Sequence, residues 1–281
     1  MARPALHRLT AAALIAAAFV MAADAAPMRR ADTGPNAIPV DVELIIAVDV
    51  SYSMDPDEQA LQRQGYVRAL RSKEFLGALR EGVNGKIALT YVEWAGPSDQ
   101  RILVPWRLID GPEAADAVAA EIAQAPYRRA SRTSISGALM FARPLFERSG
   151  YRGLRRVIDV SGDGANNAGA PVAPTRDAVV ADRITVNGLP IMLKRPTPGT
   201  MDIEHLDVYY EDCVIGGPGA FVVPIHNREQ FIDATRTKLI LEVAGRQPEA
   251  RVIPASAQKP RISCTIGETL WQQRWGGFDF Q

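Results

Sequence analysis

A run of apolar residues, ELIIAV at positions 43–48, leads directly into the polar stretch DVSYS at positions 49–53. The run is short and rich in β-branched residues, which is typical of a strand buried on both faces of a parallel sheet. A carboxylate and two hydroxyls follow where this strand should end, and open α/β sheets bind ligands beyond the carboxyl ends of their strands. The stretch therefore predicts a strand of an α/β sheet and a polar site at its end.

Asp49, Ser51 and Ser53 alternate along the chain, so an extended loop could direct their three side-chain oxygens toward one point. Three hard oxygens suit a hard divalent cation, for which Mg²⁺ is the default in proteins. The same residue types also cap helices, and helical periodicity begins nearby at Asp57. These residues alone leave both interpretations open, a metal site and a helix cap.

The spacing Asp-x-Ser-x-Ser after an apolar strand resembles the metal-ion-dependent adhesion site of von Willebrand factor A domains. That family also carries a Thr in a second loop, at the start of a helix. Here Thr133 begins the run TSISGAL and stands at the start of a predicted helix, where it could equally be a helix cap. Ser131 and Arg132 replace the glycines that precede the Thr in the family.

The third element of the resemblance is an Asp that follows another strand. Asp163 lies between two glycines directly after an apolar segment at residues 155–161, and a plain Asp-Gly turn is the alternative. The three motifs occur in the family's order between residues 43 and 167. The run from residue 184 to residue 221 further resembles a bacterial exported family of the same fold that is catalogued only as a domain of unknown function.

The resemblance implies a doubly wound, mostly parallel central sheet with helices on both faces. In the family, the two serines and the Thr contact the metal, and the aspartates bind it directly or through water. The implied ion is Mg²⁺, with Mn²⁺ or Ca²⁺ as alternatives, and one open position accepts a carboxylate from a protein partner. The implied metal site consists of Asp49, Ser51, Ser53, Thr133 and Asp163.

The amino terminus has the pattern of a secretory signal peptide. Basic residues, among them Arg8, precede an apolar run at residues 9–23, and Ala23-Asp24-Ala25 offers a cleavage site. A single anchoring helix is the alternative, but the run is short for a membrane span. We expect a periplasmic or secreted protein with no other membrane span. The expected parts are a signal peptide at 1–25, a leader at 26–40, a von Willebrand-like domain at 41–245 and a tail at 246–281.

The chain has two cysteines, Cys213 and Cys264. In an exported protein, two cysteines are most simply one disulfide, which here would tether the tail to the domain. A zinc site with His205 and His226 is an alternative, although it lacks the usual close ligand spacing.

Periodicity and turn residues predict the remaining elements. The turn at residues 96–99 predicts a hairpin, and thus an antiparallel edge strand. The tail from residue 247 has the composition of an irregular segment. The predicted helices are 57–80 with a break near Ser72, 111–124, 133–148, 174–186 and 228–243; the predicted strands are 87–92, 102–108, 155–161, 189–194 and 221–225.

Composition narrows the function classes. The chain has 281 residues, with 32 basic and 32 acidic side chains, so no basic excess points to nucleic acid. No Walker loop, G-x-S-x-G motif or nucleophile–base pair is found. The favoured function is therefore a non-catalytic, metal-dependent protein-binding module. The alternatives are a Mg²⁺-dependent hydrolase or phosphoryl-transfer enzyme at the same site, and a structural domain with an empty site.

Overall fold

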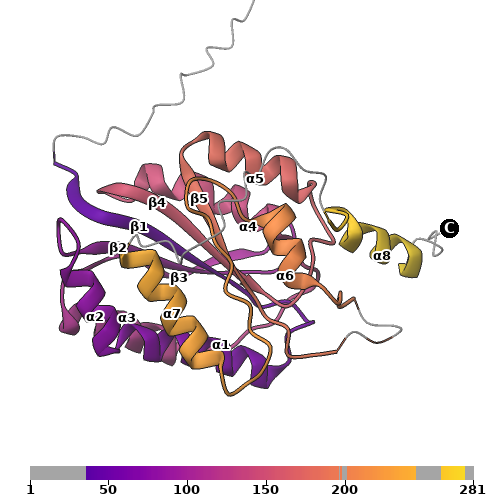
Figure 1. The fold of residues 1–281 in the computed structure, drawn as a ribbon, viewed down its shortest axis with the longest axis horizontal. Helices are drawn as coiled ribbons and strands as arrows, with labels where there is room; N and C mark the ends of the chain where they lie inside the picture. Colours follow the sequence, from indigo (N-terminus) through magenta and orange to yellow (C-terminus); the bar gives the residue numbers. More distant parts are fainter. Residues whose placement is uncertain (1–35, 196, 198–200, 245–260, 276–281) are drawn as a thin grey trace, which may run out of the picture.

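Five strands form a single sheet in the described part of the chain, which in this computed structural model comprises residues 36–195, 197, 201–244 and 261–275 (Figure 1). The strand order is β3-β2-β1-β4-β5. Neighbouring strands are parallel except for the β2–β3 hairpin, which confirms the predicted antiparallel edge strand. The strands are β1 (Ile38–Asp49), β2 (Ile87–Trp94), β3 (Gln100–Ile109), β4 (Tyr151–Gly162) and β5 (Ile184–Pro190).

Strand β1 lies in the middle of the sheet and is buried on both faces. Leu44 and Ile46 pack into the core on one face, whereas Ile45 and Ala47 pack into the core on the other. This arrangement explains the unbroken apolar run, because alternate side chains of a strand point to opposite faces. The strand begins at Ile38, within the segment predicted as a leader.

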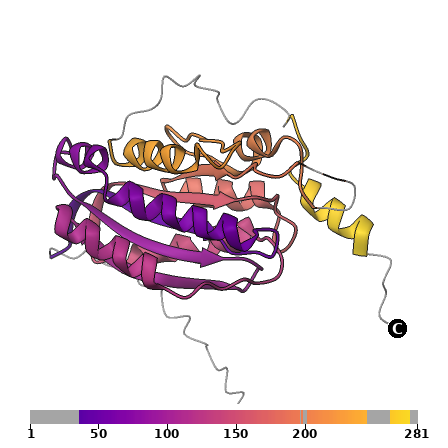
Figure 2. The same ribbon diagram turned by 90° about the horizontal axis from the view of Figure 1, so that it is seen from below.

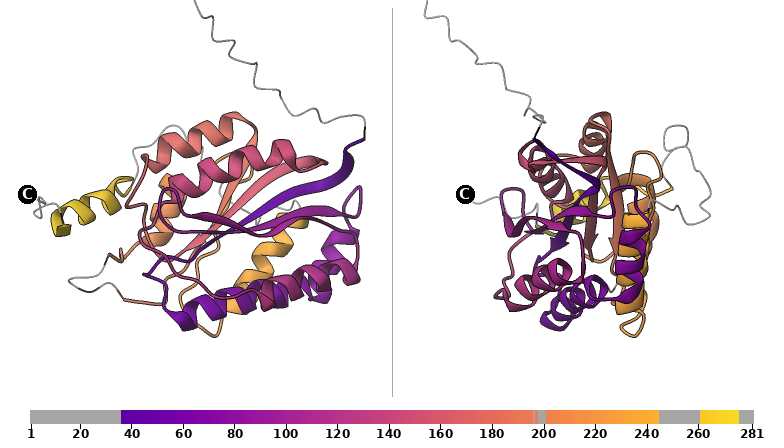
Figure 3. Two further views of the ribbon diagram at one scale, coloured as in Figure 1. Left: turned by 180° about the vertical axis from the view of Figure 1, so that it is seen from behind. Right: turned by 90° about the vertical axis from the view of Figure 1, so that its left-hand side faces the viewer.

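Helices cover both faces of the sheet, as the resemblance implied. One layer contains α1 (Pro56–Leu70), α2 (Lys73–Arg80), α3 (Pro112–Gln124) and α7 (Phe231–Ala244), with α7 alongside α1 (Figure 2). Figure 3 shows the two layers from behind and from the side. The other layer contains α4 (Ile135–Ala142) with a 3-10 turn (Arg143–Arg148), α5 (Val172–Ala181), and α6 (Leu206–Tyr209) with a π-turn (Tyr210–Val214).

The predicted boundaries after residue 174 are partly wrong. Helix α5 ends at Ala181, and the chain turns at Arg183, which has a left-handed φ of 62°. The β-branched residues that follow pair with β4 as strand β5, so this strand begins five residues before the predicted range 189–194 and ends at Pro190. Residues 221–225 form isolated bridges through Val222 and Ile225 instead of a strand. Helix α7 begins at Phe231, three residues after the predicted start.

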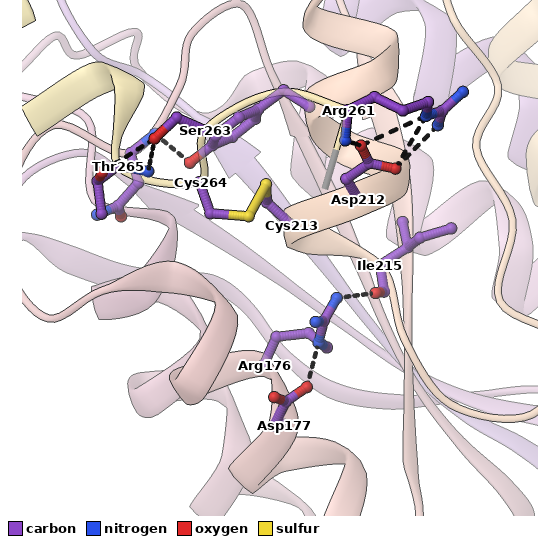
Figure 4. The surroundings of a disulfide bond; sticks show 11 residues. Arg176, Asp177, Asp212, Cys213, Ile215, Arg261, Ser263, Cys264 and Thr265 are labelled. Carbon is purple, nitrogen blue, oxygen red and sulfur yellow. Dashed lines mark hydrogen bonds and ion pairs between the residues drawn. A yellow bond between two sulfur atoms is a disulfide. The ribbon is translucent and has the colours of Figure 1, made fainter. Parts of the chain in front are cut away.

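The tail contains a helix, α8 (Ile266–Trp275), where an irregular segment was predicted. The predicted disulfide joins Cys213 to Cys264 with a Cα–Cα distance of 5.4 Å (Figure 4). It excludes the zinc alternative, because both sulfurs are used in the bond. Beside it, the Arg261 guanidinium binds the Asp212 carboxylate over 2.9 Å.

Two predictions concern membranes. No helix among the described residues is both long enough and apolar enough to span a bilayer. The predicted signal peptide, residues 1–25, lies outside the described residues.

Candidate metal centre

The loop after β1 is held in place by its backbone on both sides. Val50 donates its amide hydrogen to Trp94 of β2, and Ala130 donates to Val50. Tyr52 in turn donates to Ala130, so the loop lies between β2 and the segment before Thr133. The Asp49 carboxylate accepts a hydrogen bond from the Ser51 amide over 2.7 Å, which fixes the turn of the loop. The first motif is therefore rigidly placed at the carboxyl edge of the sheet.

Other residues cap the helices that follow the motifs. Asp55 caps α1 by accepting from the Glu58 amide over 2.8 Å, and Glu58 accepts from the Asp55 amide over 2.9 Å. Ser134 caps α4, since its hydroxyl accepts from the Gly137 amide over 3.1 Å. The capping interpretations of Asp49, the loop serines and Thr133 are therefore wrong.

Side-chain oxygens from the first and third loops converge. The hydroxyls of Ser51 and Ser53 are 2.7 Å apart. Ser53 also donates to Asp163 Oδ1 over 2.6 Å. Asp49 is fully buried and Asp163 is 6% exposed, so this cluster lies below the surface. Hydrogen bonds thereby join three of the predicted residues, Ser51, Ser53 and Asp163, in one chain. The Asp49 side chain is linked to this chain through the amide of Ser51.

Thr133 lies beside the third loop. Its amide donates to the Asn167 side chain over 3.0 Å, and the Asn167 amide donates to its carbonyl oxygen over 2.8 Å. The Thr133 hydroxyl is 3.7 Å from the point where Gly164 would carry a Cβ atom. The second and third loops are thus held together, with the Thr133 side chain next to Gly164, the glycine after Asp163.

The two carboxyl groups are held in an environment that disfavours their charge. Burial, followed by the negative charge of Asp163, raises the pKa of Asp49 well above its ordinary value. Burial raises the pKa of Asp163 to about 6, although the hydrogen bond from Ser53 opposes this shift. A bound cation would relieve both effects.

One oxygen of Asp49 has no partner. Asp49 Oδ2 is buried and accepts no hydrogen bond in the described part of the chain. It lies 2.8 Å from the point where a Cβ on Gly162 would stand, so only glycine fits at that position. A buried carboxylate oxygen without a partner is costly, and a cation would satisfy it. The oxygens of these loops therefore fit a hard divalent ion, and their assignment as metal ligands stays a prediction.

The hydroxyls are essential to such a site. Among the described residues, no group of three or more His, Cys, Asp or Glu side chains is placed to hold a metal ion. A metal here would need the Ser and Thr oxygens together with the two aspartates. This combination is the donor set that the resemblance implied.

Lys194 and Glu58 are neighbours of the site that no motif in the sequence indicated. The Lys194 ammonium contacts the Glu58 carboxylate and the Ser53 carbonyl oxygen, and lies 3.3 Å from Asp163 Oδ2. A cavity of about 560 Å³ adjoins this cluster and is lined by Glu58, Asp163 and Lys194, among others. The only available signal was the position of Lys194 as the last residue of the predicted strand 189–194, which is too common a position to be informative.

Arg132 explains the departure from the family's glycines. It has a left-handed φ of 74°, a conformation that costs residues other than glycine roughly 1–2 kcal/mol. Its guanidinium donates to the Asn167 carbonyl oxygen over 2.7 Å and lies over the Trp271 ring of α8, 3.5 Å from the ring centroid. Contacts with the third loop and the tail helix thus offset the strain at this position.

Helix α8 packs onto the third loop. Glu268 accepts a hydrogen bond from the Asn166 side chain over 2.7 Å. A Cβ atom on Gly267 would stand 2.1 Å from the Asn166 carbonyl oxygen, so the helix backbone and the loop are in direct contact. The tail therefore supports the loop that carries Asp163.

Solved structures identify the class of fold. The chain is similar to proximal thread matrix protein 1 from the mussel byssus, with 16% identity, a TM-score of 0.55, and coverage of 74% of this chain and 49% of that one. A second structure of that protein, with a zinc-occupied MIDAS motif, has 17% identity, a TM-score of 0.50, and coverage of 74% and 48%. This chain thus spans about half the length of that protein.

A bacterial relative supports the same fold. The von Willebrand factor type A protein from Catenulispora acidiphila has 14% identity and a TM-score of 0.51, and the match covers 73% of this chain and 43% of that one. The fold is therefore that of a von Willebrand factor A-like α/β domain.

The family follows from a sequence match. Residues 39–247 match the model described as "Protein of unknown function (DUF1194)", so the chain belongs to the DUF1194 family. A comparison with proteins of curated function finds no match.

Proposed function

We propose that this protein is an exported binding module that uses Mg²⁺ to recognise an acidic side chain of a protein partner. Asp49, Ser51, Ser53, Thr133 and Asp163 would hold the ion, and the ion would supply an open coordination position to a carboxylate. The observation that carries the proposal is the unpartnered buried Asp49 Oδ2 beside the hydrogen-bonded Ser51, Ser53 and Asp163 oxygens.

The fold relatives support this proposal by their printed descriptions. One solved structure of the mussel protein carries zinc at a MIDAS motif. The pilus adhesin SpaC from Lactobacillus rhamnosus GG has the same fold, with 13% identity, a TM-score of 0.52, and coverage of 75% of this chain and 31% of that one. Similar domains therefore occur in an adhesin and in a protein with a metal-occupied site.

The disulfide supports the proposed periplasmic or secreted location. Cys213 and Cys264 are bonded, and disulfides persist mainly in oxidising compartments. The predicted signal peptide points the same way.

An enzyme at this site is the second candidate, and the surroundings do not favour it. Among the described residues that line the adjoining cavity, His226 is the one imidazole, and no contact joins it to Ser53 or Asp163. A metal-dependent hydrolase needs a group that positions or deprotonates water, so we favour binding without catalysis.

The test uses Mn²⁺ as a paramagnetic substitute for Mg²⁺ and acetate as the simplest carboxylate. We expect Mn²⁺ to enhance water proton relaxation when the protein is added, and acetate to reduce that enhancement by displacing bound water. Asp49→Asn should abolish the enhancement, whereas Asp110→Asn, an exposed substitution of the same kind, should not. An acetate response equal in the two variants would contradict the proposal.

A further inference from the structure

Lys194 lies where a metal ion and a partner carboxylate would meet. Its side chain is 33% exposed, whereas the Glu58 and Asp163 side chains that it contacts are 1% and 3% exposed. The ammonium therefore stands between buried carboxylates and the adjoining cavity. It also donates to the Ser53 carbonyl oxygen, so it is tied to the first loop of the site.

We propose that Lys194 is a specificity-determining residue that weakens metal binding and strengthens binding of an acidic partner group to the metal-loaded site. This inference rests on the proposed function and concerns the affinities of the same site.

The charges of the cluster carry the first half of the argument. When both are ionised around a bound ion, Asp49 and Asp163 balance the two charges of Mg²⁺, and Lys194, which contacts Glu58 and Asp163, balances the third carboxylate, Glu58. The ammonium repels an incoming cation at short range, and its contacts with two buried carboxylates leave this repulsion less screened than between fully exposed charges. Without Lys194, the cluster would carry one more negative charge and would bind a cation more tightly.

The same charges make the loaded site receptive to an anion. With Lys194 present, the site with Mg²⁺ bound is neutral. Without Lys194, the loaded site keeps a net negative charge and repels a carboxylate. Lys194 therefore lowers the affinity of the site for the metal and raises the affinity of the metal-loaded site for a carboxylate ligand.

The cavity determines where the ligand would meet Lys194. Asp202 and Glu204 also line the cavity and would repel an acidic ligand, while Arg195 would attract it. Among the described residues, Lys194 is the cation that lies within 4 Å of the Asp163 carboxylate. An acidic side chain that enters through the cavity would thus contact the ammonium and the metal together.

The experiment measures two affinities in the whole purified protein. Calorimetric titration gives the affinity for Mg²⁺, and acetate titration of the Mn²⁺-loaded protein, followed by water proton relaxation, gives the affinity for a carboxylate. The variants are Lys194→Met and Lys194→Gln, where the Gln amide keeps a hydrogen-bond donor. The controls are Lys194→Arg, which keeps the charge, and Lys73→Met, which removes an exposed charge on α2.

We expect the two neutral variants to bind Mg²⁺ about tenfold more tightly and acetate about tenfold more weakly, within the usual range of coupling between sites. The two controls should match the wild type. A change of both affinities in the same direction, or of neither, would overturn the role of Lys194.

The failure of the proposed function gives a different pattern. If the wild type binds no Mg²⁺ but Lys194→Met does, the inference about Lys194 holds and the proposed function of the native protein fails. If no variant binds Mg²⁺, both are overturned. Melting curves of each variant check that it folds.

Discussion

Ser53 donates a 2.6 Å hydrogen bond to Asp163, a residue 110 positions later in the chain. The parallel pairing of β1 with β4, in which Val48 lies opposite Ser161, places the ends of both strands at one edge of the sheet. The two loops meet there because the sheet brings them together. The candidate site is therefore a consequence of strand order, and substitutions can test each of its parts separately.

Metal affinity should depend on pH through Asp163. Its pKa of about 6 in the folded, metal-free protein means that protons compete with the cation below that pH. We expect Mg²⁺ affinity to be about tenfold weaker at about pH 5 than at about pH 7, because the ionised fraction of a group with this pKa falls from about nine-tenths to about one-tenth over that range. Calorimetry across this range measures the change, and equal affinities at the two pH values would contradict it.

The raised pKa of Asp163 also determines how the free energy of unfolding of the metal-free protein changes with pH. The folded chain holds the Asp163 proton more tightly than the unfolded chain, whose Asp releases it near the ordinary value of 3.8. Unfolding therefore releases a proton between about pH 4 and about pH 6, and this group's contribution to the free energy of unfolding decreases as pH rises through that window. Asp163→Asn should remove this contribution, as seen in urea unfolding at the two ends of the window.

Substitutions of Thr133 and Ser134 should affect different properties, metal affinity for Thr133 and the stability of the α4 cap for Ser134. Thr133→Val keeps the shape of the side chain but removes its hydroxyl. Mg²⁺ affinity should therefore fall about tenfold or more, which is at least the loss found when a residue that hydrogen-bonds to a metal ligand is removed. Ser134→Ala removes the α4 cap and should cost about 1 kcal/mol of stability with little change in affinity. The opposite pattern in calorimetry and urea unfolding would assign the roles the other way.

A buried ion-pair cluster beneath the sheet should be essential for stability. The Lys238 ammonium of α7 lies 2.6 Å from Asp159 Oδ1 and 2.7 Å from Glu242 Oε1, and all three side chains are at most 1% exposed. Lys238→Met leaves two buried carboxylates without their cation and should cost about 3–5 kcal/mol. Lys73→Met, an exposed control, should change the free energy of unfolding by less than about 0.5 kcal/mol. A loss below about 1 kcal/mol for Lys238→Met in urea unfolding would contradict this view.

Two glycine substitutions should have opposite effects. Gly77→Ala in α2 meets no atom within 4 Å and should stabilise the protein by about 0.5–1 kcal/mol. Gly267→Ala places a methyl group 2.1 Å from the Asn166 carbonyl oxygen and should displace α8 despite its better helix propensity. Displacement would separate Trp271 from Arg132, so acrylamide should quench tryptophan fluorescence more strongly. Unchanged quenching would show that α8 does not contact the third loop.

The fold was largely predictable because its signals are local. The apolar run of β1, the turn before β3 and the break near Ser72 depend on residues close in sequence, and the structure has each of them. The end of α5 was not predictable, because Arg183 adopts a left-handed φ that no residue type in that stretch indicates. Helix α8 was missed because its contacts are with Arg132 and Asn166, far away in sequence.

The candidate site was predictable only in part. Asp49, Ser51 and Ser53 share one short motif, and the resemblance supplied Thr133 and Asp163. Lys194 reaches the site through the crossover that places β5 next to β4, and no local pattern indicates that contact. The roles of Asp55 and Ser134 as caps likewise emerged only from the hydrogen bonds of the folded chain.

The most direct test of the metal site is calorimetric titration of Mg²⁺ into the wild type and into Asp49→Asn, with Asp110→Asn as the exposed control. We predict that the wild type and the control bind one ion, and that Asp49→Asn loses affinity by about 100-fold or more, because it removes the charge of a proposed ligand. Its metal-free form should melt no lower than the wild type, since a buried charge beside Asp163 is removed. Equal Mg²⁺ affinity in the wild type and Asp49→Asn, or no binding by the wild type even with acetate present, would contradict the account.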